Sequence, residues 1–393
     1  MSVSTYSVAE AGRDVKGFRF FSAAELDAAK FSVEYLVSRV LVARQPAVLA
    51  GPKKCLKTTI AADLALSLAT GRAFLGRFPV RQPVRVGFMS GESGMGTLQE
   101  TFRRIAAEKK TTLAGVGNRL LVTENMPQFE NPAHLKALET WITNNALGVV
   151  VIDPAFMCIP GDAAGNLFTM GRLLGGFSGV FRESGCTPVL VHHTKQHISR
   201  ANPYSPPELE DIAWSGTQEW ARQWILLRRR ERYEPGSGLH RLWLQAGGSA
   251  GHSGLWGVDA DEGLFCPDTA RIWDVIVHNA KELQESEEEQ KADAREARMT
   301  DRLRGDMDKV LNAVGCHPDG ETKSALKAKS GLRTTRFETA LAALVDAGTV
   351  EECKVAKGNK QSYDGYRPAT QGPDDNHSGH SGQDTRDDLP DWH

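Results

Sequence analysis

The hydrophobic pattern between residues 46 and 244 alternates between two kinds of segment. Short apolar runs lie at 47–50, 85–90, 120–123, 148–152 and 188–192, with another at 224–228. Between them, 57–70, 97–109, 132–145 and 167–183 carry apolar residues three and four positions apart, which is the spacing of a helix with one buried face. This alternation predicts an α/β fold in which crossover helices join the strands of a parallel sheet. The continuous apolar run 149–152 indicates a strand that is covered on both faces.

The pattern changes after residue 280. Residues 281–298 contain few large apolar side chains, and Glu287 and Lys291 have a favourable helical spacing, which predicts a charged helical linker. Three short helices are predicted at 307–314, 322–329 and 334–347, followed by a hairpin of 349–355 and 361–367 around Gly358. We therefore expect an N-terminal arm (1–32), an α/β domain (33–275), a linker (276–300) and a small domain (301–368). The polar segment 369–393 has little to bury and is expected to be disordered.

Composition narrows the class of protein. Of 393 residues, 40% are hydrophobic and 24% are charged, which suits a globular chain, and the net charge of -2 excludes a uniformly basic nucleic-acid-binding surface. The six cysteines form no CxxC pair, no secretion signal is evident, and no apolar run reaches the roughly 18 to 20 residues of a membrane helix. We expect a cytoplasmic protein without a membrane partner, whose cysteines are packing residues.

The segment after the first strand has the features of a phosphate-binding loop. The strand 47–50 leads through a loop into a predicted helix, and the residues of this segment are Gly51, Pro52, Lys53, Lys54, Cys55, Leu56, Lys57, Thr58 and Thr59. Backbone N–H groups of such a loop wrap phosphates, Lys57 reaches the β- and γ-phosphates, and the hydroxyl of Thr58 holds Mg²⁺. Thr59 is the neighbouring hydroxyl. The segment therefore predicts ATP and Mg²⁺ as cofactors.

This loop departs from the pattern GxxxxGK[ST] at one position. Leu56 stands where the pattern has its last glycine, so a side chain occupies the place where backbone approaches phosphate. The alternative interpretation is an ordinary helix N-terminus with a Lys-Thr pair.

Two carboxylates follow predicted strands. Asp153 ends the run 148–152, where open α/β sheets bind ligands, and is predicted to hold Mg²⁺; alternatively, it opens a turn before Pro154. Glu92 follows the strand 85–90 and is the candidate general base that deprotonates the attacking water. Its alternative role is to cap the helix expected near Thr97.

A polar cluster follows the strand 188–192. His192 and His193 are candidate sensors of the γ-phosphate, although paired histidines also satisfy ordinary hydrogen bonds, and the sequence offers no convincing spacing for a metal site. The pattern does not distinguish between the two histidines.

The ordered set AGPKKCLKTT, FMSGES, VVVIDP and VLVHHTK resembles the RepA-like ATPases, relatives of hexameric replicative helicases in the RecA and DnaB superfamily. The resemblance covers roughly residues 33–244 and implies a RecA-like parallel sheet flanked by helices. It places the catalytic base on Glu92, the Walker B aspartate on Asp153 and the sensor on His192 or His193. It also implies a homo-oligomer such as a hexameric ring, and some members carry a bulky residue at the position of Leu56.

Members of this family donate an arginine to the active site of the neighbouring subunit. An arginine just past the strand 224–228, Arg229, is the candidate here, and a solvated basic cluster is the alternative; the arginines around this strand are Arg222, Arg228, Arg229, Arg230 and Arg232. The loops 155–167 and 196–214 correspond to loops that face the central channel of ring relatives. Lys195 and Arg200 are therefore candidates for contacting a nucleic-acid backbone.

The segment 301–368 resembles a winged helix. Gly331 separates the second and third predicted helices, and the basic residues of this region are Lys323, Lys327, Lys329, Arg333 and Arg336. Such a face neutralises DNA phosphates, whereas the alternative is a winged helix that docks protein.

The leading hypothesis is a Mg²⁺-dependent ATPase that couples hydrolysis to binding or translocation of single- or double-stranded DNA, as in a replicative helicase-like protein of a plasmid, phage or mobile element. The alternative is a DNA-binding regulator whose P-loop domain is a slow nucleotide switch. A structural scaffold is the third class.

Overall fold

The computed structural model describes residues 13–15, 18–161, 165–195, 203–214, 216–264, 266, 270–358 and 361–369. The chain divides into two compact units, residues 1–284 and 285–393. The first unit starts with an antiparallel pair, β1 (Arg13–Val15) and β2 (Phe18–Phe20), and the short helix α1 (Ala23–Ala28). The segment 370–393, for which disorder was expected, lies outside the described residues.

A nine-stranded sheet forms the centre of the first unit, in the order β13-β12-β11-β10-β5-β9-β8-β6-β7. Six neighbouring strands are parallel, which confirms the α/β prediction. They are β5 (Ala47–Gly51), β6 (Val86–Ser90), β7 (Leu120–Thr123), β8 (Val149–Asp153), β9 (Thr187–His193) and β10 (Gln223–Arg229). All six match predicted strands to within a few residues.

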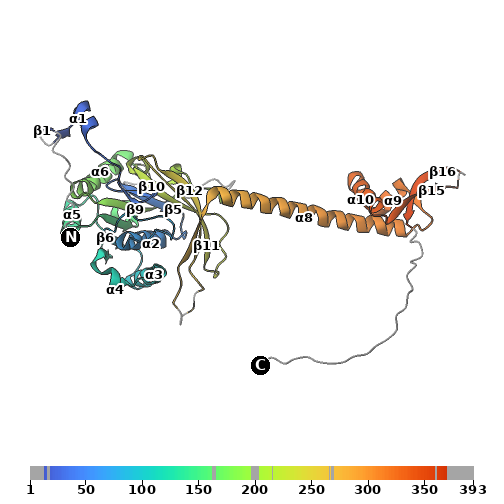
Figure 1. Ribbon diagram of the computed structural model, residues 1–393, viewed down its shortest axis with the longest axis horizontal. Helices are drawn as coiled ribbons and strands as arrows, with labels where there is room; N and C mark the ends of the chain where they lie inside the picture. Colours follow the sequence, from blue (N-terminus) through green and yellow to red (C-terminus); the bar gives the residue numbers. More distant parts are fainter. Residues whose placement is uncertain are drawn as a thin grey trace, which may run out of the picture. The chain divides into compact units, whose positions relative to one another are not determined.

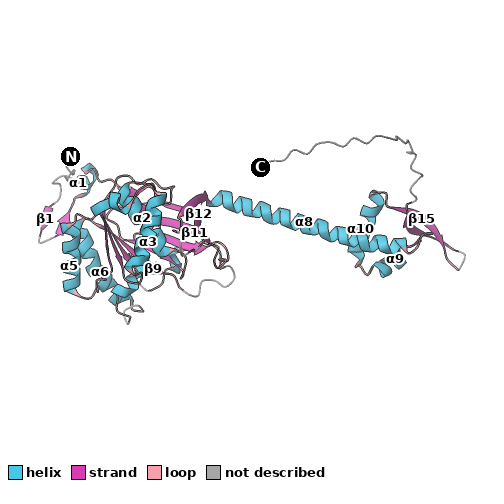
Figure 2. Cartoon of the chain, turned by 90° about the horizontal axis from the view of Figure 1, so that it is seen from below, coloured by secondary structure: helices cyan, strands magenta, loops and turns pink. Residues whose placement is uncertain are grey.

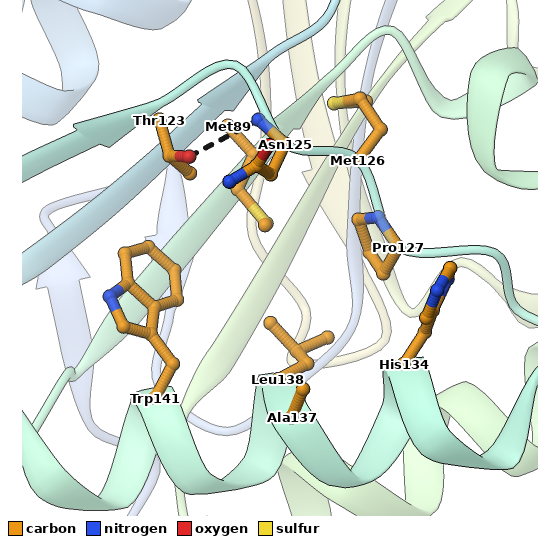
Figure 3. Close-up of a pocket in the computed structure, with 9 residues that line it drawn as sticks. All are labelled: Met89, Thr123, Asn125, Met126, Pro127, His134, Ala137, Leu138 and Trp141. Carbon is orange, nitrogen blue, oxygen red and sulfur yellow. Dashed lines mark hydrogen bonds between the residues drawn. The ribbon is translucent and has the colours of Figure 1, made fainter.

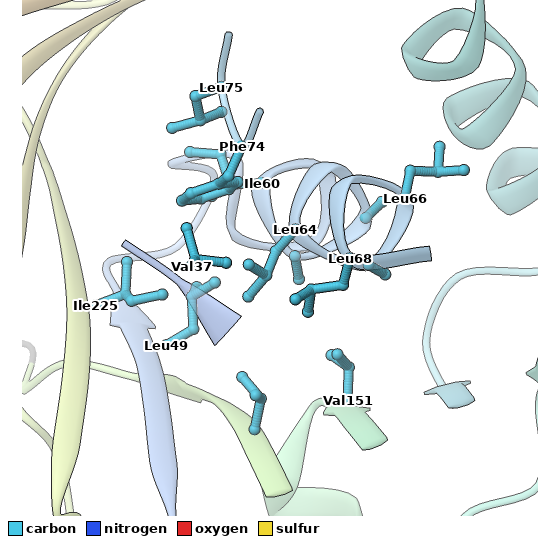
Figure 4. Packing of buried hydrophobic residues seen from close by; sticks show 14 of the residues in the cluster. Val37, Leu49, Ile60, Leu64, Leu66, Leu68, Phe74, Leu75, Val151 and Ile225 are labelled. Atoms are coloured by element: carbon cyan, nitrogen blue, oxygen red, sulfur yellow. The ribbon is translucent and has the colours of Figure 1, made fainter. Parts of the chain in front are cut away.

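Helices cover both faces of this sheet (Figure 1). Along β8, Val149 and Val151 belong to one buried cluster, whereas Val150 and Ile152 belong to another, because successive side chains point to opposite faces. The first cluster packs under α2 (Lys57–Thr70) and α3 (Met95–Glu108), and the second under α5 (Pro132–Asn144) and α6 (Leu167–Ser184). Figure 4 shows Leu64 and Leu68 of α2 above Leu49 and Val151. The sheet is thus a RecA-like core flanked by helices, as predicted.

Three further strands continue the sheet beyond β10. They are β11 (Leu239–Gly248), β12 (Ser253–Asp261) and β13 (Asp274–Asn279), and each pairs antiparallel with its neighbour. The sequence analysis did not predict these strands. It also missed the small hairpin of β3 (Tyr35–Val37) and β4 (Leu41–Val42), whose apolar residues join the core. Short elements between the strands are α4 (Leu113–Val116) and α7 (Thr217–Trp220).

The second unit contains three helices and a small sheet. Its elements are the C-terminal part of α8 (Ala280–Gly315), then β14 (Glu321–Thr322), α9 (Lys323–Ser330), α10 (Thr334–Asp346), β15 (Val350–Ala356) and β16 (Ser362–Pro368). The strands pair antiparallel in the order β14-β16-β15, and residues such as Val310, Leu326, Phe337 and Leu344 form a separate core.

One expectation about this region needs correction. The linker and the first short helix were predicted as separate elements, but α8 is one helix of 36 residues (Figure 2). Beyond Ala280, none of the apolar side chains described in the first half of α8 is buried. This explains why the hydrophobic pattern suggested two separate segments. The predicted pair of Glu287 and Lys291 lies outside the described side chains. Among the helices of the described chain, none has both the length and the apolar character required to cross a membrane.

Candidate nucleotide-binding site

The predicted site residues meet at the carboxyl edge of the parallel strands. Lys57, Glu92, Asp153 and His193 line one pocket of about 860 Å³, together with the loop 53–59. Because β5, β6, β8 and β9 run in the same direction, the residues after each strand reach the same edge. The pocket therefore gathers residues that lie more than a hundred positions apart in the sequence.

The loop between β5 and α2 has the geometry of a phosphate cradle. Gly51 is tightly enclosed, because a Cβ atom there would lie 2.6 Å from Sγ of Cys55 and 2.9 Å from the carbonyl oxygen of Leu227. Lys57 is buried at the first position of α2, and its ammonium donates to the carbonyl oxygen of Pro52 at 2.8 Å. Burial lowers the pKa of Lys57. The backbone N–H groups of this helix N-terminus supply the positive end of the helix dipole to an anion.

Leu56 adopts the backbone conformation that the usual glycine would have. Its φ of 61° and ψ of 23° lie in the left-handed region, where a side chain other than glycine costs roughly 1–2 kcal/mol. The leucine side chain is partly buried against the main core cluster. The chain thus holds a left-handed backbone conformation, which glycine adopts without strain, at a position occupied by leucine.

Asp153 and Thr58 lie together, as the metal-site prediction required. Asp153 is 4% exposed at the end of β8, and its carboxylate shares a hydrogen bond with the Thr58 side chain. Burial raises the pKa of Asp153 to about 6, although the hydrogen bond with Thr58 and the charge of Lys57 act in the opposite direction. A buried carboxylate beside a hydroxyl provides the hard oxygen ligands that Mg²⁺ prefers, and a divalent cation would offset the desolvation of this carboxylate. These residues therefore fit a Mg²⁺ site.

Glu92 lines the pocket and does not cap the following helix. Helix α3 begins at Met95 after the N-cap residue Gly94, which makes no side-chain capping bond. The backbone N–H of Met95 instead donates to the carboxylate of Glu124 at 3.1 Å. Glu92 is exposed and close enough to Lys57 and Asp153 to affect the pKa of each. The alternative helix-cap role is therefore filled by another residue.

The two histidines of β9 have different surroundings. His192 is 2% exposed, its Nε2 lies 3.1 Å from the carbonyl oxygen of Ala213, and burial lowers its pKa to about 4. His193 lines the nucleotide pocket, and burial followed by the charges of Lys57 and Lys53 lowers its pKa. Of the two sensor candidates, only His193 lines the pocket, whereas His192 contacts the segment before α7.

Arg229 lies over the P-loop of its own chain. Its guanidinium donates to the carbonyl oxygen of Lys54 and lies 4.7 Å from the ring centroid of Tyr233. This position differs from the one expected, in which Arg229 would reach the active site of a neighbouring subunit. The neighbouring arginines are paired elsewhere: Arg228 with Asp211, and Arg230 with Asp259.

Among the pocket residues that the sequence analysis did not identify are Tyr233, His240 and Glu262. Tyr233 follows β10, His240 belongs to β11, and Glu262 follows β12. His240 and Glu262 belong to or follow strands that the hydrophobic pattern did not reveal, whereas Tyr233 comes after the predicted strand β10. No sequence motif marks them, because their place in the pocket depends on the antiparallel extension of the sheet.

A second pocket, of about 490 Å³, lies next to the Glu92 segment (Figure 3). Trp141, Leu138 and His134 of α5 face Met89 of β6 and Asn125 across it. A Cβ atom at Gly91, the residue before Glu92, would lie 2.7 Å from both Met126, which lines this pocket, and Met157. The backbone beside Glu92 is therefore closely packed against the wall of the second pocket.

The predicted nucleic-acid contacts of the first unit are weakly supported. The ammonium of Lys195 donates to the carbonyl oxygen of Glu210 at 2.7 Å, so it is engaged within its own loop. Arg200 lies outside the described residues.

The basic side chains of the second unit differ in whether they are already engaged within the chain. Arg336 forms a two-pronged pair with Asp306 of α8, and Lys323 lies 2.8 Å from Glu338. Lys327 donates to the hydroxyl of Thr334 at 2.6 Å, whereas Lys329 and Arg333 are exposed. The predicted basic run is thus partly neutralised. Arg336, which was predicted to contact DNA phosphates, is instead engaged in an ion pair within its own chain.

Comparison with known families supports the P-loop assignment. Residues 15–197 match the family model described as AAA domain, which is an AAA-type P-loop ATPase domain. The matched segment contains the P-loop, Glu92, Asp153 and both histidines. No curated protein matches the chain.

Proposed function

We propose that this chain uses its AAA-type P-loop ATPase domain to hydrolyse ATP in a Mg²⁺-dependent reaction that is coupled to DNA binding or translocation. The observation that carries the proposal is the convergence of Lys57, Glu92 and Asp153 in one pocket. Phosphoryl transfer to water needs three groups: a cation that binds the phosphates, a carboxylate that activates the water, and a buried carboxylate that holds the metal.

Each residue has a distinct role in this proposal. The N–H groups of the P-loop and the ammonium of Lys57 bind the β- and γ-phosphates, while Thr58 and Asp153 hold the metal. Bound Mg²⁺ supplies charge neutralisation on the phosphate oxygens. Glu92 orients the attacking water and accepts its proton, and His193 hydrogen-bonds near the terminal phosphate. Catalysis then depends mainly on positioning and electrostatic stabilisation.

DNA is the proposed partner because of the second unit. Its order of helix, strand, two helices and a β-hairpin is that of a winged helix, with Gly331 at a φ of 67° between α9 and α10. Exposed Lys329 lies in the last turn of α9, and exposed Arg333 is the N-cap residue of α10; cations around such a turn contact phosphates in helix-turn-helix proteins. The acidic residues Glu338 and Asp346 on α10 favour backbone contacts over deep insertion of this helix.

A regulator with slow turnover is the second candidate, and Leu56 favours it. The leucine side chain sits at a P-loop position where backbone and phosphate normally approach closely. In this second candidate function, nucleotide binding controls assembly or DNA binding, and slow hydrolysis returns the protein to its starting state.

The proposed assembly is a homo-oligomer such as a hexameric ring, following the resemblance to RepA-like ATPases and replicative helicases of plasmids, phages or mobile elements. One experiment separates the candidates: ATP turnover is measured with and without single- and double-stranded DNA, alongside the mass in solution. A motor shows turnover that DNA stimulates in an oligomer. A switch shows slow turnover with nucleotide-dependent mass, and a scaffold shows neither.

A further inference from the structure

Arg229 is held in place by a continuous stack of side chains. The Arg229 guanidinium lies over the Tyr233 ring, 4.7 Å from the ring centroid, and the same ring stacks on His240 with centroids 4.7 Å apart and an interplanar angle of 16°. The tyrosine ring therefore contacts both the arginine and the histidine within the chain. A cation over an aromatic face is attracted by the ring quadrupole, so the stack favours one position of the guanidinium.

The far end of this stack is anchored in the protein interior. His240 is 6% exposed, and its Nε2 lies 3.1 Å from Oε2 of Glu262. The other oxygen of Glu262 lies 2.5 Å from Nη2 of Arg104, a buried residue of α3. Side chains that are locked by packing and paired charges hold a geometry more tightly than side chains on a mobile loop.

The anchor also reaches the segment that carries the candidate base. Helix α3, which contains Arg104, begins three residues after Glu92. The chain of contacts therefore runs from the P-loop carbonyl of Lys54 through Arg229 and the stack to the helix behind Glu92.

We propose that Arg229 binds the terminal phosphates of ATP in its own subunit, and that Tyr233, braced by His240 and Glu262, is the positioning residue that holds it there. The proposal rests on ATP as the ligand of the pocket. Arg229 lines that pocket with Lys57, Glu92 and Asp153, and its guanidinium already lies against the P-loop. In this arrangement Arg229 acts in cis, within the subunit whose P-loop it contacts.

The first test compares nucleotide affinities of the full chain with fluorescent ATP and ADP analogues. Arg229→Ala should weaken binding of the ATP analogue by roughly tenfold or more relative to the ADP analogue, because a charge-assisted contact to the γ-phosphate is lost. Tyr233→Leu should reproduce this loss of ATP preference, whereas Tyr233→Phe, which keeps the ring, should resemble the parent. Equal losses for both nucleotides would mean that Arg229 only shapes the P-loop, and would overturn the proposal.

A double variant tests whether Tyr233 acts through Arg229. If it does, Arg229→Ala combined with Tyr233→Leu should lose no more ATP preference than Arg229→Ala alone. Additive losses would assign Tyr233 an independent role and remove it as the positioning residue. Unfolding curves for each variant verify that the fold is retained.

A mixing experiment distinguishes action in cis from action in trans. Subunits with Arg229→Ala are mixed with subunits with Glu92→Gln. If Arg229 acts in cis, every pocket lacks either Arg229 or Glu92. The mixture should then show no recovered ATP turnover. Recovery would show that Arg229 serves a neighbour and would overturn the proposal. If the parent does not hydrolyse ATP, the proposed function fails, while the nucleotide affinities still test the role of Arg229.

Discussion

The ammonium of Lys109 lies 3.1 Å from Oδ1 of Asp63, and both side chains are almost completely buried. The same carboxylate accepts hydrogen bonds from the backbone N–H of Leu75 at 3.0 Å and from the indole of Trp273 at 2.8 Å. Asp63 belongs to α2, the helix that follows the P-loop, and Lys109 is the C-cap residue of α3. This pair therefore ties the phosphate-binding helix to the helix that follows Glu92.

Removing one partner should strongly destabilise the first unit. Asp63→Ala leaves Lys109 charged and buried without its carboxylate, which costs about 3–5 kcal/mol for a buried pair. Urea unfolding measures this loss: the midpoint concentration should fall while the m-value, the slope of the unfolding free energy against urea concentration, stays unchanged. Lys136→Ala is the control, because Lys136 pairs with Glu139 at the surface with 73% of its side chain exposed, and it should cost less than about 1 kcal/mol. Similar effects from both variants would contradict a central role for Asp63.

Glu92→Gln and Lys57→Ala should have different effects. Glu92→Gln should keep ATP binding and lower turnover by about 10²- to 10⁴-fold, since a general base contributes on that order. Lys57→Ala should lose tight ATP binding, because the main cation for the β- and γ-phosphates is gone. Glu124→Gln is a matched control, as Glu124 caps α3 without lining the pocket. Turnover at the parent rate in Glu92→Gln would exclude Glu92 as the base.

The parallel part of the fold could be predicted because its strands are buried on both faces. Runs such as 149–152 are apolar at every position, so the sequence predicts them as buried strands of a parallel sheet. The strand β11 alternates between exposed and buried positions at its start and contains His240 and Arg241, so the same signal is absent. Strand β13 has no fully buried residue. Strand β11 pairs with β10, and β13 pairs with β12; a local pattern does not report such pairing.

The sequence indicated which residues reach the pocket where they come at or just after the end of a strand, but not which partners side chains contact; the catalytic roles stay predictions. Asp153 and Glu92 reach the pocket because parallel strands end at one edge. The contact of Arg229 with Lys54 joins positions 175 residues apart, and sequence alone did not indicate that it forms within one chain. Similarly, charge counting in the second unit did not reveal that Arg336 is bound by Asp306.

Leu56→Gly tests whether the leucine slows the enzyme. Glycine adopts a φ of 61° without the roughly 1–2 kcal/mol penalty of a side chain, and it opens the space beside the phosphates. We expect faster ATP turnover with little change in stability, because the lost packing of Leu56 offsets the relieved backbone. Leu56→Ala is the control, since it loses the packing but keeps Cβ, and should not raise turnover. A slower Leu56→Gly variant would show that the leucine itself is needed.

Glu262 should make stability depend on pH in the acidic range. Burial alone would raise its pKa, but the hydrogen bond with His240 and the charge of Arg104 lower it to about 2. Because the folded pKa is below the unfolded value, this contribution is fully present above about pH 4.5 and is lost as pH falls toward 2. Glu262→Gln should cost about 1–3 kcal/mol near neutral pH, and less at pH 3, in urea unfolding. A cost that does not change with pH would contradict the ionic role of Glu262.

DNA binding by the full chain should depend on the exposed cations of the second unit. Each phosphate contact releases close to one counterion. Replacing Lys329 and Arg333 by alanine should therefore make the slope of log affinity against log salt concentration less negative by about 1.8. ATP turnover without DNA should stay near the parent value, because neither residue lines the nucleotide pocket. Arg336→Ala is the matched control: it removes the same charge, but Arg336 is engaged with Asp306, so the slope should hardly change. Salt dependence that responds equally to all three cations would mean that net charge alone attracts DNA. Binding that none of these variants alters would place the DNA contact outside α9 and α10 and identify the second unit as a protein-docking module.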